Sequence, residues 1–310
     1  MWKQVYRICP NLKVIKALIY STRPKQWSKN LIIYFAFLFT VEQAWDLHDL
    51  DAVFVLFIKT TFGFLIFSLL TGAIYLFNDT LDVKEDQKHP KKKFRPLPSG
   101  ELSKITAILF SVLFGGSSII LSYILEPRFS LICIIYVVIF TSYCMLLKRI
   151  ALLDVMTISA GFVLRAAAGA AIINVPISPW LYVCTGLGAL LIALGKRRNE
   201  LDIAGIKSKS QRPVLTKYSH DFINQLISVV APSTLIAYIF YTFTANGLPD
   251  NHAMMLTIPF VIYGLFRYLF LIQFKNLGET PEDILLTDKP IIISILGWLI
   301  TAGLVLTIFR

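Results

Sequence analysis

Long apolar stretches recur along this 310-residue chain and constrain its fold more than any other feature. A helix that crosses the ~30 Å hydrocarbon core of a bilayer needs about 20 predominantly apolar residues. Eight clear stretches approach or exceed that length, at about residues 53–77, 105–125, 129–147, 150–173, 180–195, 222–245, 253–274 and 290–309. Since inside lipid only helices and closed barrels satisfy their backbone hydrogen bonds, the sequence predicts an all-α membrane protein, a single domain over residues 1–310.

A ninth span is expected near the N-terminus, where the apolar stretch is short. Only residues 31–41 are free of charge, so a full span has to include Lys25 and Lys29. Four residues apart, these lysines would share one face of an α-helix. They either extend toward the lipid head groups or face inward and bind an anion. Residues 1–22 are expected to form a basic, amphipathic segment at the membrane surface.

The distribution of positive charge predicts the orientation of the chain. Hydrophobic residues make up 56% of the sequence, yet the net charge is +11. Of the 30 lysines and arginines, 25 fall in residues 1–30, 78–104, 148–149, 196–221 and 275–289, whereas the loops expected on the other side hold Arg128 and Arg310. This asymmetry places the N-terminus in the cytoplasm, the C-terminus outside, and the protein in the cytoplasmic (inner) membrane. The charge therefore does not indicate a nucleic-acid partner.

A cluster of acidic residues directly follows the second expected span. Asp79, Asp82 and Asp86 stand three and four residues apart, so on a helix they share a face, with Asn78 beside them. Oxygen ligands of this kind suit a hard divalent cation, and Mg²⁺ prefers one or two carboxylates together with phosphate oxygens. We therefore predict a site for Mg²⁺ and a diphosphate; the alternative is a solvated helix end.

A basic stretch follows the aspartates at once and includes Lys92 and Arg95. The prolines at 90, 96 and 98 do not allow the helix to continue through them. The pattern predicts a rigid basic loop beside the acidic face. Its cations are candidates for binding phosphate.

Two further groups of charged residues are expected on the cytoplasmic side. The first is Lys148 and Asp154, with Arg165 about three turns into the fifth expected span, and all three are candidates for binding substrate. A charge at membrane depth costs at least ~2.5 kcal/mol, so Asp154 and Arg165 need partners or water, which a polar cavity open to the cytoplasm would supply. The second group follows the sixth expected span and consists of Lys196, Arg197 and Glu200.

These motifs together resemble the UbiA superfamily of intramembrane prenyltransferases. The resemblance rests on Asn78-Asp-x-x-Asp-x-x-x-Asp, on His89-Pro-x-Lys-x-x-Arg-Pro and on nine expected helices. Within the superfamily the chain is most similar to the decaprenyl-phosphate phosphoribosyltransferases, in residues 23–30, 153–155, 161–165, 168–169 and 195–200.

The resemblance implies transfer of 5-phosphoribose from phosphoribosyl diphosphate to a polyprenyl phosphate, with Mg²⁺ as cofactor. We assign the acidic cluster to the metal and the diphosphate, namely Asn78, Asp79, Asp82 and Asp86, with Glu200 as a weaker candidate. The basic groups are assigned to phosphates: Lys92 and Arg95 to the leaving group or the 5-phosphate, Lys196 and Arg197 to the 5-phosphate, and Lys25 and Lys29 to the lipid phosphate. These last three assignments are interchangeable at this stage.

One departure separates this chain from ordinary prenyltransferases of the superfamily, which carry a second aspartate-rich motif after helix six. Here that place holds Lys196-Arg-Arg-Asn-Glu-Leu-Asp202. Cations favour an additional phosphate, which phosphoribosyl diphosphate has. The rival activity is prenyl transfer from a polyprenyl diphosphate to an aromatic acceptor, and a transporter is a third alternative, for which discontinuous helices in matching halves would be expected. A homo-oligomer is a further open expectation.

Overall fold

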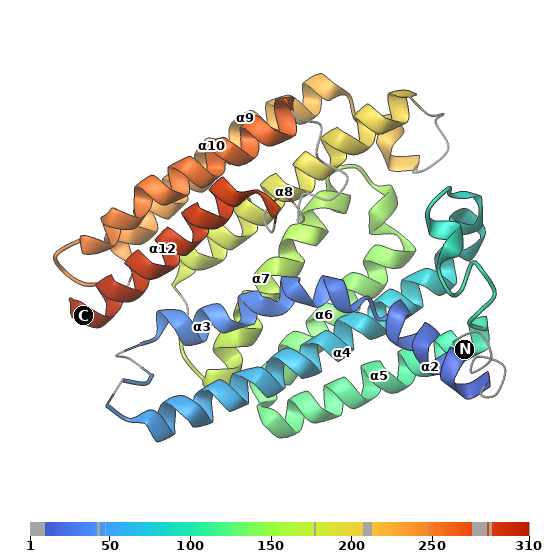
Figure 1. The fold of residues 1–310 in the computed structure, drawn as a ribbon, viewed down its shortest axis with the longest axis horizontal. Coiled ribbons are helices and arrows are strands. Elements are labelled where there is room, and N and C mark those ends of the chain that lie inside the picture. The colour runs from blue at the N-terminus through green and yellow to red at the C-terminus, as the bar shows by residue number, and fades with distance from the viewer. Residues whose placement is uncertain are drawn as a thin grey trace, which may run out of the picture.

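The computed structural model describes residues 10–41, 44–46, 48–176, 178–206, 213–245, 247–274, 284 and 287–309. Within these ranges the chain forms α-helices joined by short 3₁₀-helices, and the long helices lie side by side (Figure 1). The predicted all-α fold is therefore confirmed.

Eight of the described helices are long and apolar enough to cross a membrane. They are α4 (Leu50–Lys88), α5 (Lys104–Leu125), α6 (Pro127–Met145), α7 (Leu153–Ile173), α8 (Pro179–Ile206), α9 (His220–Thr244), α10 (Ile258–Phe274, preceded by η5, Ala253–Thr257) and α12 (Lys289–Ile308). Each corresponds to one of the eight clear apolar stretches. Helices adjacent in sequence pack together, notably α4 with α5, α7 with α8 and α8 with α9.

The ninth expected span is not confirmed as a continuous α-helix. Its residues form a 3₁₀-helix, η1 (Pro24–Ile33), and then the short α3 (Tyr34–Phe39). Because a 3₁₀-helix has three residues per turn, residues four apart point about 120° from each other. The predicted common face of Lys25 and Lys29 is therefore wrong: Lys25 is exposed and Lys29 is half-buried.

Polar side chains set the beginnings of several helices. The N-cap side chains of α4, α5, α9 and α12 each accept a hydrogen bond from the backbone N–H three residues later; these caps are Asp49, Ser103, Ser219 and Asp288. At its other end α4 stops at Lys88, just before Pro90, as the prolines predict. The helix α4 is 39 residues long, and the acidic cluster lies on its last three turns.

The helix α2 (Pro10–Ser21) packs against the bundle through one face. Ala17 and Leu18 are buried in a cluster with Leu76 of α4 and Ala107 of α5, whereas Ile15 and Ile19 are exposed. The helix is thus amphipathic. Its position at a membrane surface stays a prediction.

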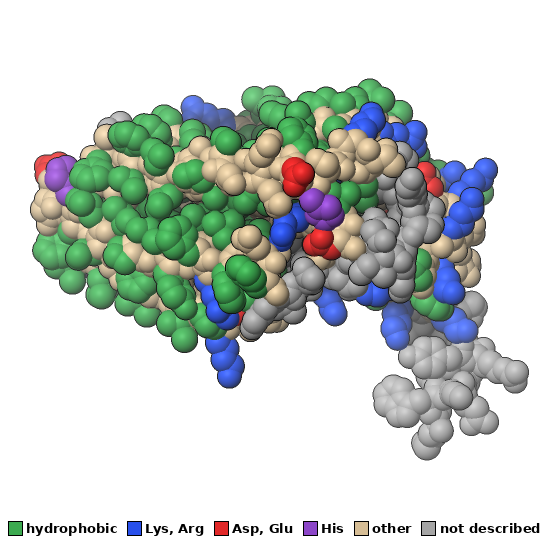
Figure 2. Space-filling view, turned by 90° about the horizontal axis from the view of Figure 1, so that it is seen from above, with side chains coloured by type: hydrophobic (Ala, Val, Ile, Leu, Met, Phe, Trp, Pro, Cys, Tyr) green, Lys and Arg blue, Asp and Glu red, His purple; other side chains and the backbone are tan. Residues whose placement is uncertain are grey.

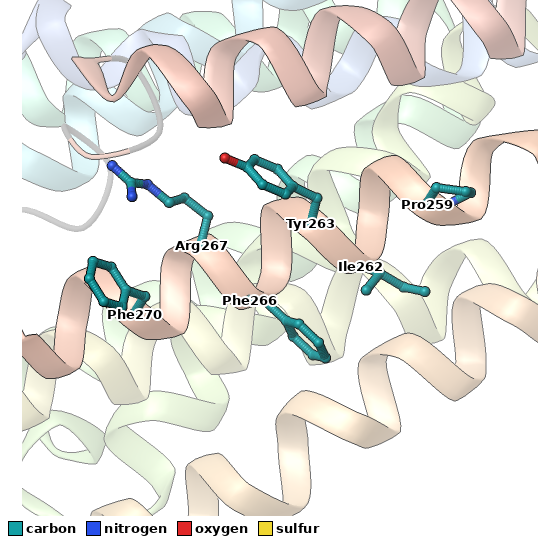
Figure 3. A pocket seen from close by; sticks show the side chains of 6 residues that line it. All are labelled: Pro259, Ile262, Tyr263, Phe266, Arg267 and Phe270. Carbon is teal, nitrogen blue, oxygen red and sulfur yellow. The ribbon is translucent and has the colours of Figure 1, made fainter.

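Apolar side chains cover much of the face shown in Figure 2, and the Lys and Arg side chains visible there lie mainly toward one end. One shallow apolar groove of about 600 Å³ lies along α10, lined by Pro259, Ile262, Tyr263, Phe266, Arg267 and Phe270 (Figure 3). All six residues belong to one helix, so the groove is a feature of the outer surface. The candidate site lies elsewhere, at the C-terminal end of α4.

Candidate functional site

The aspartates of α4 divide into two groups according to the cations that they contact. Asp79 and Asp86, seven residues apart and both buried, share one arginine. Asp82, which is half-buried, instead shares a lysine with Asn78. The helix therefore presents its acidic residues to two neighbouring partners rather than as a single stripe.

The first group is neutralised from two sides. Arg95, from the loop after α4, places its Nη1 atom 2.7 Å from Asp86 Oδ2 and 3.5 Å from Asp79 Oδ1. Lys92 of the 3₁₀-helix η2 (Lys92–Phe94) lies 3.7 Å from Asp86 Oδ1. From the other side, Arg23 at the N-cap of η1 donates a hydrogen bond to Asp79. The predicted basic loop beside the acidic helix is thus confirmed.

The second group joins α4 to the segment between α6 and α7. Lys148 lies in η3 (Leu147–Arg149), and its Nζ atom is 2.6 Å from Asp82 Oδ1 and 3.3 Å from Asn78 Oδ1. The Asn78 amide in turn donates to Asp82 Oδ2 at 3.0 Å. One cation from another helix end therefore holds two of the predicted ligands of Mg²⁺.

A third charged group lies between α7 and α8, and its central pair, Asp154 and Arg197, is buried. Arg197 Nε donates to Asp154 Oδ2 at 2.6 Å, and Arg197 Nη1 donates to Glu200 Oε2 at 2.5 Å. Tyr218, just before α9, donates to Asp154 Oδ1 at 2.7 Å. This group therefore links the ends of three helices.

Tyr218 also accepts a hydrogen bond from the backbone N–H of Leu152, at 2.7 Å. Leu152 has a φ of 70°, which residues other than glycine rarely adopt, so the tyrosine stabilises an unusual turn at the start of α7. Burial and the bond to Asp154 raise the pKa of Tyr218 to about 12.

The remaining predicted residues are not all brought to the aspartates. Arg165 lies deeper in the bundle, where its Nε donates to Asn30 Oδ1 at 2.8 Å and its Nη2 to Tyr136 OH at 3.0 Å. Lys196 is half-buried on α8 and Lys25 is exposed on η1. Next to Arg197, Arg198 contacts Asn224 and the carbonyl of Ile272, so two arginines of the basic triplet are bound within the protein.

Several residues of these networks had no assigned role in the sequence analysis, among them Arg23, Asn30 and Tyr218. Arg23 directly precedes Pro24, and a residue before proline disfavours helical backbone angles. The sequence could therefore have indicated that Arg23 stands at the start of a helix. Asn30 stands between the largely polar residues 24–29 and the apolar residues 31–41, which did not single it out. Nothing in the sequence around Tyr218 indicated its contact with Asp154, 64 residues away.

The donor set at the end of α4 fits Mg²⁺ that binds together with a phosphate ligand. Among the described residues no group of three His, Cys, Asp or Glu side chains is arranged to hold a metal ion by itself, and each aspartate of α4 contacts a cation. Mg²⁺ characteristically takes one or two protein carboxylates and completes its shell with water and substrate phosphates. The oxygens of Asp79, Asp82, Asp86 and Asn78 meet that need, and their cation partners can contact the phosphates.

Comparisons with known proteins agree with this architecture. The sequence model of the UbiA prenyltransferase family matches residues 30–282. Decaprenyl-phosphate phosphoribosyltransferase of Mycolicibacterium smegmatis is 32% identical, covering 95% of this chain and 93% of the relative, and that of Mycobacterium tuberculosis is 30% identical, covering 95% of both.

A solved structure shares the fold. The UbiA homologue of Archaeoglobus fulgidus bound to GPP and Mg²⁺ superimposes with a TM-score of 0.70 at 18% identity, covering 94% of this chain and 100% of that one. The family match extends over most of the chain and includes the acidic helix, the basic loop and the α7–α8 group. The chain belongs to the UbiA prenyltransferase family.

Proposed function

We propose that this protein transfers 5-phosphoribose from phosphoribosyl diphosphate to a polyprenyl phosphate and releases diphosphate. The observation that carries the proposal is the set of three aspartates at the end of α4, each paired with a cation from another segment. Carboxylates suited to a metal and cations suited to phosphate thereby meet at one place. The relatives named decaprenyl-phosphate phosphoribosyltransferase support the choice of substrates.

The aspartates and Asn78 would hold the metal, and the cations beside them would hold the donor. Mg²⁺ bound by Asp79, Asp82, Asp86 and Asn78 supplies positive charge to the leaving diphosphate. Arg95 and Lys92 contact Asp86, and Lys148 contacts Asp82, so all three cations would lie beside the diphosphate and could bind its oxygens. We assign them to the donor for this reason.

The chemical step needs no general base. An oxygen of the lipid phosphate, already anionic, forms a bond to the anomeric carbon as the bond from that carbon to the diphosphate breaks. The protein contributes by orienting the two substrates and by stabilising the negative charge that grows on the leaving group. Arg95, Lys92 and Lys148 are placed for the second task.

The far end of the donor carries a monophosphate, which we assign to Lys196. Arg197, assigned to the same phosphate in the sequence analysis, is buried and binds Asp154 and Glu200, so we now assign it to holding the end of α8 in place. Lys25 and Lys29 are proposed for the lipid phosphate. If Lys196 binds the 5-phosphate, Lys196→Ala weakens binding of phosphoribosyl diphosphate by ~10- to 150-fold and leaves binding of free diphosphate unchanged.

We also propose that this site faces the cytoplasm and that the N-terminus is cytoplasmic, on the basis of the charge asymmetry. The test is labelling of single cysteines in a cysteine-free background. Ser99→Cys, in the loop after α4, should react with a membrane-impermeant reagent from the cytoplasmic side, and Asp250→Cys, after α9, from the opposite side. Reaction of both from one side contradicts this orientation.

The decisive experiment incubates purified protein with phosphoribosyl diphosphate labelled in the ribose and with polyprenyl phosphates, followed by extraction of the lipids. The expected result is label in the lipid fraction that depends on the lipid phosphate. A parallel reaction supplies polyprenyl diphosphate and an aromatic acceptor. Product in the second reaction and none in the first would replace this proposal by the prenyltransferase activity.

A further inference from the structure

Arg165 is a buried cation that lies away from the aspartates and whose described contacts are with neutral groups. Its side chain is within hydrogen-bond distance of Asn30 and Tyr136. Its guanidinium lies 5.1 Å from the ring centroid of Phe162, 5.3 Å from that of Tyr136 and 5.8 Å from that of Phe67. The residue is 4% exposed, and burying a charge at this position costs free energy, so its retention indicates a function.

The contact of Arg165 with Asn30 fixes the 3₁₀-helix η1 between two transmembrane helices. Asn30 is fully buried; its Oδ1 atom accepts from Arg165 of α7, and its Nδ2 atom donates to Ser68 Oγ at 3.0 Å and to Thr71 Oγ1 at 3.4 Å, both on α4. An amide can do both because it carries an acceptor and two donors. An aspartate at position 30 could not donate to Ser68 and Thr71, and a leucine there could make none of the three hydrogen bonds.

A second contact one turn later fixes η1 to α7. Gly169 lies against Ile33, and a Cβ atom at this glycine would be 2.1 Å from the carbonyl oxygen of Ile33. Only glycine allows that approach. The C-terminal half of η1 is therefore held at Asn30 and at Ile33, on a segment whose 3₁₀ winding over ten residues is unusually long.

The other end of η1 reaches the acidic cluster. Its N-cap, Arg23, has a φ of 54°, lies with its guanidinium 4.7 Å from the ring centroid of Tyr75 and contacts Asp79. Thr22, just before it, packs so closely on α4 that a Cβ at Gly72 would be 2.9 Å from its Cβ. The same short helix is thus bound to α7 at one end and to a predicted ligand of Mg²⁺ at the other.

We propose that Asn30 and Arg165 are positioning residues that hold Arg23 in contact with Asp79. Their described hydrogen bonds are with groups other than the aspartates; they set the position of η1, and η1 sets the position of Arg23. Arg165, a candidate substrate ligand in the sequence analysis, thereby receives a different role. The kinetic part of this inference rests on the proposed phosphoribosyl transfer.

A double-mutant cycle tests whether Asn30 acts through Arg23. Misplacing a group at a reacting centre by about 1 Å costs on the order of 100-fold in rate, so Asn30→Ala should lower kcat/KM by about that factor. If the loss runs through Arg23, the double variant Arg23→Ala/Asn30→Ala is no slower than Arg23→Ala alone. Losses that multiply, or an Asn30→Ala variant with full activity, overturn the inference.

A matched control separates positioning from general destabilisation. Thr257 belongs to another buried hydrogen-bond network, in which its Oγ1 atom lies 2.6 Å from Tyr238 OH, and Trp298 Nε1 donates to the same hydroxyl at 2.6 Å. Thr257→Val should lower thermal stability in the same way and keep the activity. Should Asn30→Ala fail to fold, Ser68→Ala and Thr71→Val each remove a single bond to Asn30, and both are expected to reduce activity without coupling to Thr257→Val.

A geometric readout needs no activity at all. In protein freed of native cysteines, Arg23→Cys and Asp79→Cys are joined by a short bifunctional thiol reagent, with Asn30 intact or replaced by alanine. The expected result is a clear fall in cross-linking when Asn30 is replaced, and an equal yield would overturn the positioning role. If the wild-type protein does not transfer phosphoribose, the proposed function fails while this measurement still decides the inference.

Discussion

Two charged clusters lie at the same end of the bundle, made of similar residues but in different surroundings. In the cluster on α4 the cations remain partly exposed, from 14% for Lys148 to 34% for Lys92. In the cluster between α7 and α8, the side chains of Asp154 and Arg197 are 0% and 1% exposed. In the α4 cluster the cations thus reach solvent although Asp79 and Asp86 are buried, whereas both members of the Asp154–Arg197 pair are buried.

This difference in burial distinguishes a cluster whose ion pairs a ligand can displace from a cluster whose ion pairs stay intact. An ion pair whose cation reaches solvent is easier to separate than one buried on both sides, because the released cation stays hydrated, so a ligand can displace it. Breaking a buried pair by removing one partner costs about 3–5 kcal/mol, because the other charge is left uncompensated. The α4 cluster is thus suited to binding and release, and the α7–α8 cluster to holding helix ends together.

The largest effect is expected from removing a carboxylate of the α4 cluster. Asp82→Asn should lower turnover by on the order of 1,000-fold, since it removes charge where the metal and the diphosphate would bind. Thermal stability should change little, because Asp82 lies at the partly exposed edge of the bundle. Turnover and melting temperature are measured on the same preparation.

Excess chelator should abolish the activity of the wild-type protein in the same way, and added Mg²⁺ should restore it. The matched control is Glu101→Gln, an exposed carboxylate in the loop before α5, which should have no effect. Full turnover of Asp82→Asn, or full turnover in chelator, would remove the aspartates from the catalytic site.

The buried cluster should respond in the opposite way. Arg197→Met leaves Asp154 without its cation and should destabilise the protein by about 3–5 kcal/mol. The double variant Asp154→Asn/Arg197→Met removes both charges and should recover most of that loss. Thermal unfolding in detergent checks both variants. Equal stability of Arg197→Met and wild type would mean that this pair, like those on α4, is exchangeable.

A smaller effect is expected from the basic loop. Arg95→Ala should raise the KM for phosphoribosyl diphosphate by ~10- to 150-fold, the value of one charge-assisted contact of about 1.5–3 kcal/mol. Lys93, in the same loop but exposed and lying over the ring of Phe94, is the matched control, and Lys93→Ala should leave KM unchanged. If both variants lose affinity equally, the loop acts through its overall charge and not through Arg95.

The sequence was sufficient for the parts of the fold that depend on local pattern. Apolar length predicted the eight long helices, and the prolines predicted the end of α4. The first expected span was different, because its winding depends on tertiary contacts: Asn30 and Ile33 are fixed by residues more than 30 positions away. A pattern that assumes an α-helix therefore assigned Lys25 and Lys29 to one face.

In the candidate site, too, the features set by local sequence were predicted and those set by long-range contacts were not. The spacing of Asp79, Asp82 and Asp86 and the basic loop behind them are local, and both were predicted. The identity of each partner is not local, since Lys148 reaches Asp82 across 66 residues and Arg23 reaches Asp79 across 56. Sequence alone also could not show that Arg197 is buried, because charge pattern carries no information on burial.

The smallest effect is expected at Tyr218, which supports the buried cluster from outside. Tyr218→Phe removes the bond to Asp154 and the acceptor of the Leu152 N–H, and should destabilise the protein by about 1 kcal/mol at neutral pH.

The pKa of Tyr218 is about 12 in the folded protein, against about 10 when unfolded. A raised pKa gives stability that is complete below pH ~10 and is lost as pH rises toward 12, because the unfolded chain then releases the proton first. The stability advantage of wild type over Tyr218→Phe should therefore shrink between pH ~10 and pH ~12 in thermal melts. An advantage that grows over this range would mean that Tyr218 loses its proton in the folded protein and does not donate to Asp154.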